Sequence, residues 1–190
     1  VDEKMQVIPG TEFAIDCDTL LLSVGLIPEN EISRGLDLKL HPLTNGPVVD
    51  QHRQTSEEGF FAAGNVVHVH DLVDFVSEEA EIAGKYAALY AQKQMAAKLI
   101  DVEVLPGDGI RTCVPQHIAV GSEGEKVRLF MRVRQPMRKS VLTVYSDGEL
   151  VFSRKLPVAK PSEMVAVDLP ADKVCNLKSS LEVTIRQEGE

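Results

Sequence analysis

Hydrophobic and polar positions follow different patterns in the two halves of the chain. In the first half, Thr19–Val24 is apolar without alternation, which is typical of a strand buried on both faces of a parallel sheet. A second buried strand is predicted at Phe60–Ala63, and a long helix from Asp71 or Asp74 to Ile100. Shorter elements are a hairpin of Met5–Ile8 with Phe13–Cys17, a helix near Glu29–Ser33 and a strand at Val48–Val49. Strands alternating with helices predict an α/β fold.

The second half contains short strand patterns separated by turn signals. The predicted strands are Arg111–Val120, Lys126–Arg134, Ser140–Ser146, Glu149–Leu156, Met164–Leu169 and Leu181–Arg186. Asp147-Gly148 is a strong hairpin turn. In the strand over 126–134, apolar residues alternate with Arg128, Phe130 and Arg132, which indicates one buried face. We therefore expect an antiparallel sandwich of immunoglobulin or fibronectin type.

Composition excludes several classes of protein. Of 190 residues, 44% are hydrophobic and 26% charged, as in soluble globular proteins. No apolar run approaches the ~18 residues that span a bilayer, and the formal charge of −9 argues against a nucleic-acid partner. The first residues resemble no signal peptide. Three widely spaced cysteines indicate free thiols in a reducing compartment, so we expect a cytoplasmic location, with Cys17 and Cys113 packed rather than reactive.

The charge changes sign along the chain. Up to Ile110 there are 19 acidic and 7 basic residues, a net charge of −12, whereas the remainder carries 10 and 13, a net charge of +3. Leu105–Gly109 contains a proline and two glycines, which break regular structure. We therefore predict two domains, over residues 1–104 and 105–190, whose opposite charges favour mutual docking.

Two segments carry a resemblance to a known family. Thr55-Ser-Glu-Glu-Gly-Phe-Phe-Ala-Ala-Gly-Asn-Val66 resembles the C-terminal flavin motif of the pyridine nucleotide-disulfide oxidoreductase class, flavoproteins with two dinucleotide-binding domains. Cys17–Asn30, with Ser23-Val24-Gly25, is similar to the strand and glycine turn that leave the NAD(P) domain in that family. Ser23–Pro28 and His68–Asp74 look closest to sarcosine-oxidase-alpha-like proteins and those associated with glycerol-3-phosphate dehydrogenase. The resemblance covers about residues 10–100.

The resemblance implies a partial Rossmann-like FAD/NAD(P)-binding domain and a set of cofactor contacts. Gly25 and Gly64 would let the backbone approach the cofactor, since glycine has no Cβ. Asn65 stands where the family has an acid that bonds a ribityl hydroxyl, and its amide can still bond one. By family position, Leu72, Val73 and Asp74 would turn their N–H groups towards the flavin.

His68 and His70 are the candidate catalytic pair, and two interpretations stay open. Near a flavin, a histidine could relay protons around neutral pH. Alternatively, both side chains cap the helix start or bond the loop backbone. No metal site is expected, because neither a cysteine nor an acid has the spacing to complete a zinc set with them.

The Gly-x-Gly-x-x-Gly fingerprint that binds a dinucleotide pyrophosphate is absent from the sequence. We therefore expect this chain to be the C-terminal part of a longer oxidoreductase that passes hydride between NAD(P) and FAD, and to bind FAD weakly or not at all alone. Its expected partners are the remaining FAD/NAD(P) domains and a dehydrogenase subunit, and an open sheet edge permits a homodimer. The alternative is a non-catalytic module whose β-sandwich docks partner subunits.

Overall fold

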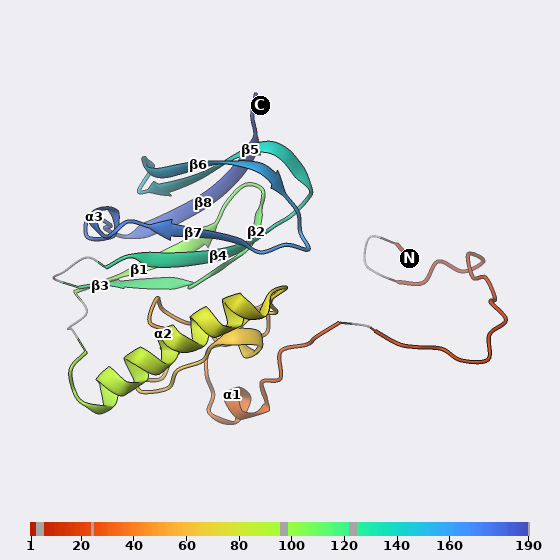
Figure 1. Cartoon of the computed structure of the whole chain (residues 1–190), viewed down its shortest axis with the longest axis horizontal. Helices are drawn as coiled ribbons and strands as arrows, with labels where there is room; N and C mark the ends of the chain where they lie inside the picture. Colours follow the sequence, from red (N-terminus) through yellow and green to blue (C-terminus); the bar gives the residue numbers. More distant parts are fainter. Residues whose placement is uncertain (3–5, 24, 96–98, 122–124, 190) are drawn as a thin grey trace.

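The computed structural model describes residues 1–2, 6–23, 25–95, 99–121 and 125–189. An extended N-terminal segment leads into a loop-rich region with one long helix, and the C-terminal part contains two β-sheets (Figure 1). In the part of the chain that is described, no helix combines the length and apolarity needed to cross a membrane.

The N-terminal segment differs from the sequence prediction. Residues 6–23 form neither the hairpin nor the buried strand, and Met5 and Val24, at the ends of those predicted strands, lie outside the described residues. Apolar side chains along the segment are exposed, Leu21 to 89% and Phe13 to 83%. A strand needs a neighbouring strand to pair with its backbone, and no described strand lies beside this segment. The parallel sheet of the predicted α/β fold is therefore not formed within it.

The loop-rich region contains short helices and isolated β-bridges instead of a sheet. Helix α1 covers Glu31–Gly35 and the 3₁₀ helix η1 covers Gly64–Val66. The strand predicted at Val48–Val49 is not formed, and the isolated bridge of Leu40 with Pro47 lies just before it. The strand predicted at Phe60–Ala63 is reduced to one isolated bridge, of Phe61 with Gln54. The region between α1 and η1, which was predicted to contain both strands, is thus mostly irregular.

Helix α2 covers Val73–Ala91 and is shorter than predicted. It begins within the expected range but stops nine residues before Ile100, because Lys93 adopts a left-handed conformation with φ of 58°. Residues 96–98 of the predicted helix lie outside the described residues, and Ile100 belongs to the first strand. Three small residues on one face of α2, Ala80, Gly84 and Ala88, are exposed.

Two sheets build the C-terminal part, which we call the two-sheet part (residues 99–189). The five-stranded sheet has the order β3-β1-β8-β5-β6, and the three-stranded sheet the order β2-β4-β7. The strands are β1 Ile100–Pro106, β2 Ile110–Val114, β3 His117–Val120, β4 Val127–Val133, β5 Met137–Ser146, β6 Glu149–Ala159, β7 Val165–Leu169 and β8 Ser180–Gln187. A short helix, α3 Ala171–Val174, precedes β8.

Three features of the two-sheet part depart from the prediction. The strand expected over Arg111–Val120 is two strands in different sheets, so Cys113 and His117 do not share a face. β1 pairs with β8 in parallel, so the sheet is mixed rather than antiparallel. β1 also spans the boundary expected between residues 104 and 105, because its alternating Val102 and Val104 are fully buried in the core of the two sheets.

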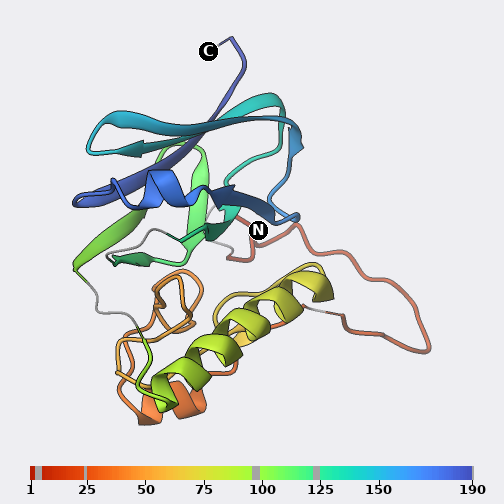
Figure 2. The same cartoon turned by 60° about the vertical axis from the view of Figure 1, so that its left-hand side comes forward.

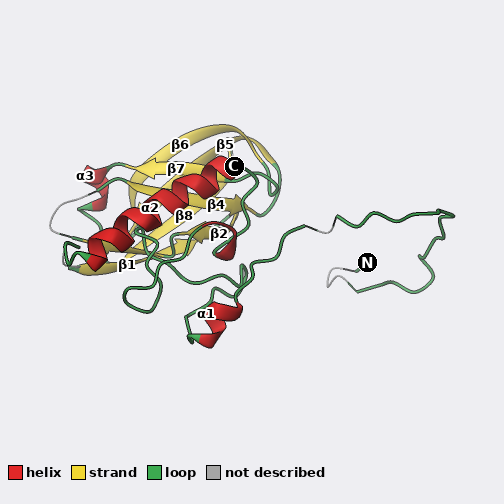
Figure 3. Cartoon of the chain, turned by 60° about the horizontal axis from the view of Figure 1, so that its bottom comes forward, coloured by secondary structure: helices red, strands yellow, loops and turns green. Residues whose placement is uncertain are grey.

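One hydrophobic core lies between the two sheets. Both contribute to it, for example Leu142 and Ile185 from the large sheet and Leu129 and Met131 from the small one. The prediction of one buried face on β4 is therefore confirmed for its odd-numbered residues. Its even-numbered residues are also covered, because α2 and the loops before it lie along this side of the two sheets (Figures 2 and 3). Phe130 is fully buried and packs against Phe75 of α2.

Candidate functional site

Gly64 begins the turn between the loop-rich region and α2. Its φ of 71° lies in the left-handed region, and an added Cβ would stand 3.0 Å from Cγ1 of Val76. The backbone N–H of Gly64 donates a hydrogen bond of 2.9 Å to Oε2 of Glu79. The turn thus requires glycine and is attached directly to the helix that follows it.

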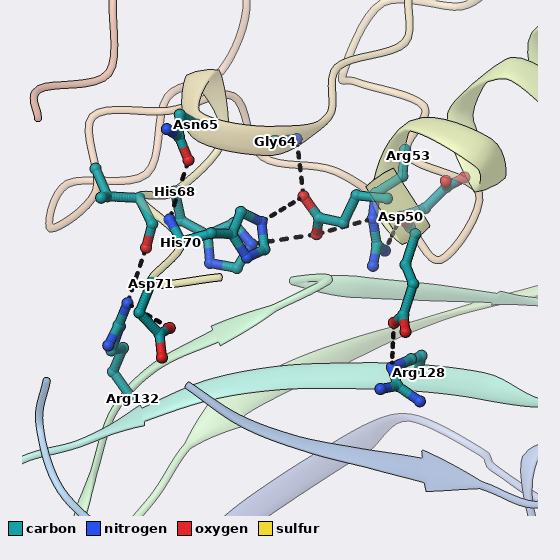
Figure 4. A network of polar contacts seen from close by, with 12 residues as sticks. Asp50, Arg53, Gly64, Asn65, His68, His70, Asp71, Arg128 and Arg132 are labelled. Atoms are coloured by element: carbon teal, nitrogen blue, oxygen red, sulfur yellow. Dashed lines mark hydrogen bonds and ion pairs between the residues drawn. The ribbon is translucent and has the colours of Figure 1, made fainter. Parts of the chain in front are cut away.

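Asn65 holds the loop that carries the two histidines. Its Oδ1 accepts the backbone N–H of His70 at 3.0 Å (Figure 4). The side-chain amide nitrogen of Asn65 donates no hydrogen bond to any described residue, so this group is available to a ligand. The two ends of one side chain therefore have separate roles: the oxygen orders the loop and the amide can bind.

Glu79 is a fully buried carboxylate at the centre of the site. Oε1 lies 3.1 Å from Nε2 of His68 and 3.2 Å from Nε of Arg53, and Oε2 lies 3.0 Å from Nε2 of His70 (Figure 4). An ionised carboxylate only accepts hydrogen bonds, so both imidazoles carry a proton on Nε2. We call Arg53, His68, His70 and Glu79 the Glu79 cluster.

The electrostatics of the Glu79 cluster favour an ionised glutamate beside a neutral His68. Burial raises the pKa of a carboxyl, but hydrogen bonds from the two histidines and the charge of Arg53 outweigh it, and the pKa of Glu79 lies well below its ordinary value. Burial lowers the pKa of His68, and its hydrogen bond to Glu79 only partly opposes this shift. The ionised Glu79 is therefore paired with the cation of Arg53 beside a neutral His68.

Phe130 of β4 forms the apolar floor beneath the histidines. Its ring centroid lies 6.0 Å from that of His68 and 5.6 Å from that of His70, both in edge-to-face geometry. Phe75 of α2 packs against the same ring at 5.4 Å. The rings of His68 and His70 are only 4.3 Å apart, so aromatic contacts as well as hydrogen bonds fix their orientation.

The cluster brings together one possible metal-ligand set. The ligating atoms of His68, His70 and Glu79 all lie within 4.8 Å of one another, so the expectation that no acid joins the two histidines is wrong. Two features disfavour a metal ion. First, the cationic guanidinium of Arg53 contacts the same carboxylate. Second, a histidine that binds a metal through one ring nitrogen donates the N–H of the other to a partner, and the buried Nδ1 of His70 has no hydrogen-bond partner among the described residues. That the chain binds no metal there stays a prediction.

The N-terminus of α2 is open. No side chain caps it at Leu72, and Leu72 and Val73 are 52% and 74% exposed. The first N–H groups of a helix have no partner within the helix, and together with the helix dipole they favour a negatively charged ligand. The structure thus brings Gly64, Asn65 and the start of α2 into one short segment.

The remaining residues predicted from the sequence, Gly25 and the cysteines, make none of the contacts described for the Glu79 cluster. Gly25 has a φ of 89° and lies in the extended N-terminal segment, with open space where a Cβ would be. Cys113 is packed as expected, but Cys17 is exposed, because the strand predicted to bury it is not formed.

Sequence reasoning missed Arg53 and Glu79. An acid near the start of a helix can complement the helix dipole while exposed to solvent, so the position of Glu79 alone gives no sign of burial. Its spacing from Ala83 and Ala87, four and eight residues on, could have indicated a buried helix face. No comparable signal marks Arg53.

Residues 1–87 match the family model of the pyridine nucleotide-disulphide oxidoreductases. The match includes the extended segment, the Gly64 turn, the Glu79 cluster and most of α2, and it supports an oxidoreductase-type domain in this part of the chain. It ends before the two-sheet part. No solved structure matches the chain.

Proposed function

We propose that the oxidoreductase-type segment, residues 1–87, contributes the flavin-contacting end of an FAD- and NAD(P)-dependent enzyme that passes hydride between nicotinamide and flavin. The proposal rests on two features that follow one another along the chain, the glycine turn at Gly64 and the uncapped start of α2 after Leu72. Buried Glu79 of α2 accepts the backbone N–H of Gly64 and so attaches the turn to the helix. FAD, when bound, would supply the ring that accepts or releases the electrons.

Each residue of the segment has a chemical task in this proposal. The turn at Gly64 brings backbone close to the ribityl side, because no Cβ intervenes. The amide of Asn65 donates to a ribityl hydroxyl. The N–H groups of Leu72, Val73 and Asp74 meet the edge of the ring that becomes negative on reduction, a contribution of about 0.3–1 kcal/mol per helix end and ~2 kcal/mol at most.

The wider arrangement follows from the same proposal. The fingerprint for the pyrophosphate would come from FAD/NAD(P) domains outside these 190 residues, in a protein of the sarcosine-oxidase-alpha-like or glycerol-3-phosphate-dehydrogenase-associated type. The two-sheet part would be a sandwich of immunoglobulin or fibronectin type. Electrons would pass to a partner dehydrogenase subunit in the cytoplasm. His68 and His70 would order the flavin-contacting loop instead of relaying protons, since Glu79 occupies the Nε2 atom of each.

The test is flavin content. We expect the native protein that carries these residues to show flavin absorbance, and the 190-residue chain titrated with FAD to show weak binding or none. In the native protein, Gly64→Val and Asn65→Leu should lower FAD affinity, while Gly84→Ala on the exposed face of α2 should leave it unchanged. A native protein that neither contains nor binds FAD would overturn the proposal and favour the alternative, a non-catalytic docking module.

A further inference from the structure

Strand β4 presents three alternate side chains to the segment that leads into α2. Arg128, Phe130 and Arg132 point away from the core between the sheets and contact residues between His68 and Glu78. Residues two apart on a strand lie on one face, so a single strand of the two-sheet part follows the proposed flavin-contacting loop along its length.

Arg132 makes the most specific of these contacts. Its Nη2 donates to the carbonyl oxygen of Val69 at 3.0 Å and to Oδ1 of Asp71 at 3.2 Å (Figure 4). Its Nη1 donates to the carbonyl oxygen of Pro161 at 3.2 Å. One guanidinium thus joins the loop before α2 to two segments of the two-sheet part.

Asp71 is held from a second direction. Both of its carboxylate oxygens accept the backbone N–H of Met164, at 3.1 and 3.2 Å. Asp71 stands two residues before Val73, where α2 begins. The side chains of Arg132 and Asp71 are only 19% and 25% exposed, which limits the weakening of their interaction by solvent.

The other two β4 residues fix α2 further along. Nε of Arg128 lies 2.9 Å from Oε2 of Glu78, and Phe130 packs against Phe75. The first two turns of α2 therefore contact β4 at Glu78 and Phe75, and the loop before them contacts it at Asp71. Among these contacts, that of Arg132 is nearest in sequence to the uncapped N–H groups.

We infer that Arg132 is a positioning residue: through Asp71 it holds the first turn of α2 where the proposed flavin contact requires it. The role in flavin binding rests on the proposed function, whereas the positioning itself does not. A guanidinium donates in a fixed planar fork and can serve Val69, Asp71 and Pro161 together, which the single ammonium of lysine cannot do with the same geometry. The two-sheet part would then act on the flavin site without touching the flavin.

Hydrogen exchange on the 190-residue chain tests the positioning. The amides of residues 77–79 donate to the carbonyls of residues 73–75 and report on the first turn of α2. We expect their exchange to accelerate about tenfold in Arg132→Met and by a smaller factor in Arg132→Lys, since one charged hydrogen-bond donor is lost or displaced. Asp71→Asn should act in the same direction. Arg134→Lys, at an exposed position directly after β4 and two residues beyond Arg132, is the matched control.

Flavin affinity of the native protein tests the coupling. We expect Arg132→Lys, the variant that retains the charge, to raise the FAD dissociation constant about tenfold, with amide exchange in β5 and β8 unchanged, whereas Arg134→Lys has no effect. Unchanged exchange at residues 77–79 in all Arg132 variants would overturn the positioning role. If exchange responds but FAD affinity does not, the coupling to flavin is wrong. A native protein without FAD overturns the proposed function alone, because the exchange experiment still decides the positioning.

Discussion

The carboxylate of Glu79 accepts the backbone N–H of Gly64 at 2.9 Å, across fifteen residues of sequence. This bond joins the second turn of α2 to the glycine turn that precedes the helix. The same carboxylate also neutralises Arg53, which is fully buried. The turn, the two histidines and the helix therefore form one unit, whose geometry exists before any ligand binds.

Replacing Glu79 should destabilise the chain strongly. Glu79→Gln removes the ion-pair partner of the buried Arg53 guanidinium, and breaking a buried pair typically costs about 3–5 kcal/mol. We expect the free energy of unfolding, measured with urea, to fall by about 3 kcal/mol. Glu81→Gln, an exposed acid on the same helix, should change it by less than about 0.5 kcal/mol. Equal effects of the two substitutions would contradict a structural role for the Glu79 cluster.

The elements of the two-sheet part were predictable because their signals are local. Alternation and the Asp147-Gly148 turn placed β5 and β6 to within a few residues, and the helix signals placed the start of α2 near Val73. The end of α2 was not predictable in this way. Lys93 stops it in a left-handed conformation, and nothing in a sequence of good helix formers marks that residue.

The candidate site depended on packing that the sequence does not display. Glu79 becomes a buried anion only because the loop with His68 and His70 and the turn with Arg53 converge on it from other parts of the chain. Similarly, the apolar run at residues 19–23 predicts a buried strand, but burial needs a partner strand, and none of those described supplies one.

Acid should destabilise the protein in two stages. The pKa of His68 is lowered, so below its ordinary value of 6.5 the unfolded chain takes up a proton before the folded one does, and stability falls. The pKa of Glu79 is also lowered, so further stability is lost as the pH falls below 4.5. Urea unfolding between pH 8 and pH 2 measures both stages. His68→Gln should reduce the first one without abolishing it, because burial also lowers the pKa of His41. A stability that stays constant down to pH 5 would contradict this assignment.

The three thiols should divide into two classes. Burial raises the pKa of Cys113 to about 12, whereas Cys17 and Cys175 are exposed. At pH 8, an aromatic disulfide reagent should therefore label two thiols per native chain and the third only after unfolding. The double variant Cys17→Ser, Cys175→Ser should show no labelling until denaturant is added. Rapid labelling of three thiols in the native protein would show that Cys113 is not in the core between the sheets.

Gly64, in the turn before α2, and Gly84, inside α2, should respond in opposite directions to substitution by alanine. At Gly64 alanine must adopt a left-handed φ of 71°, with its Cβ 3.0 Å from Val76, so we expect a loss of about 1–2 kcal/mol.

 

Gly84 lies inside α2 on its exposed face, and no atom stands within 4 Å of where its Cβ would be. Gly84→Ala should therefore stabilise the chain by about 0.5–1 kcal/mol, because alanine loses less backbone entropy in a helix. Urea unfolding of the two variants should thus show shifts of opposite sign. A loss of stability in both would mean that the exposed face of α2 is covered, and a gain in both would mean that the Gly64 turn does not hold its left-handed conformation.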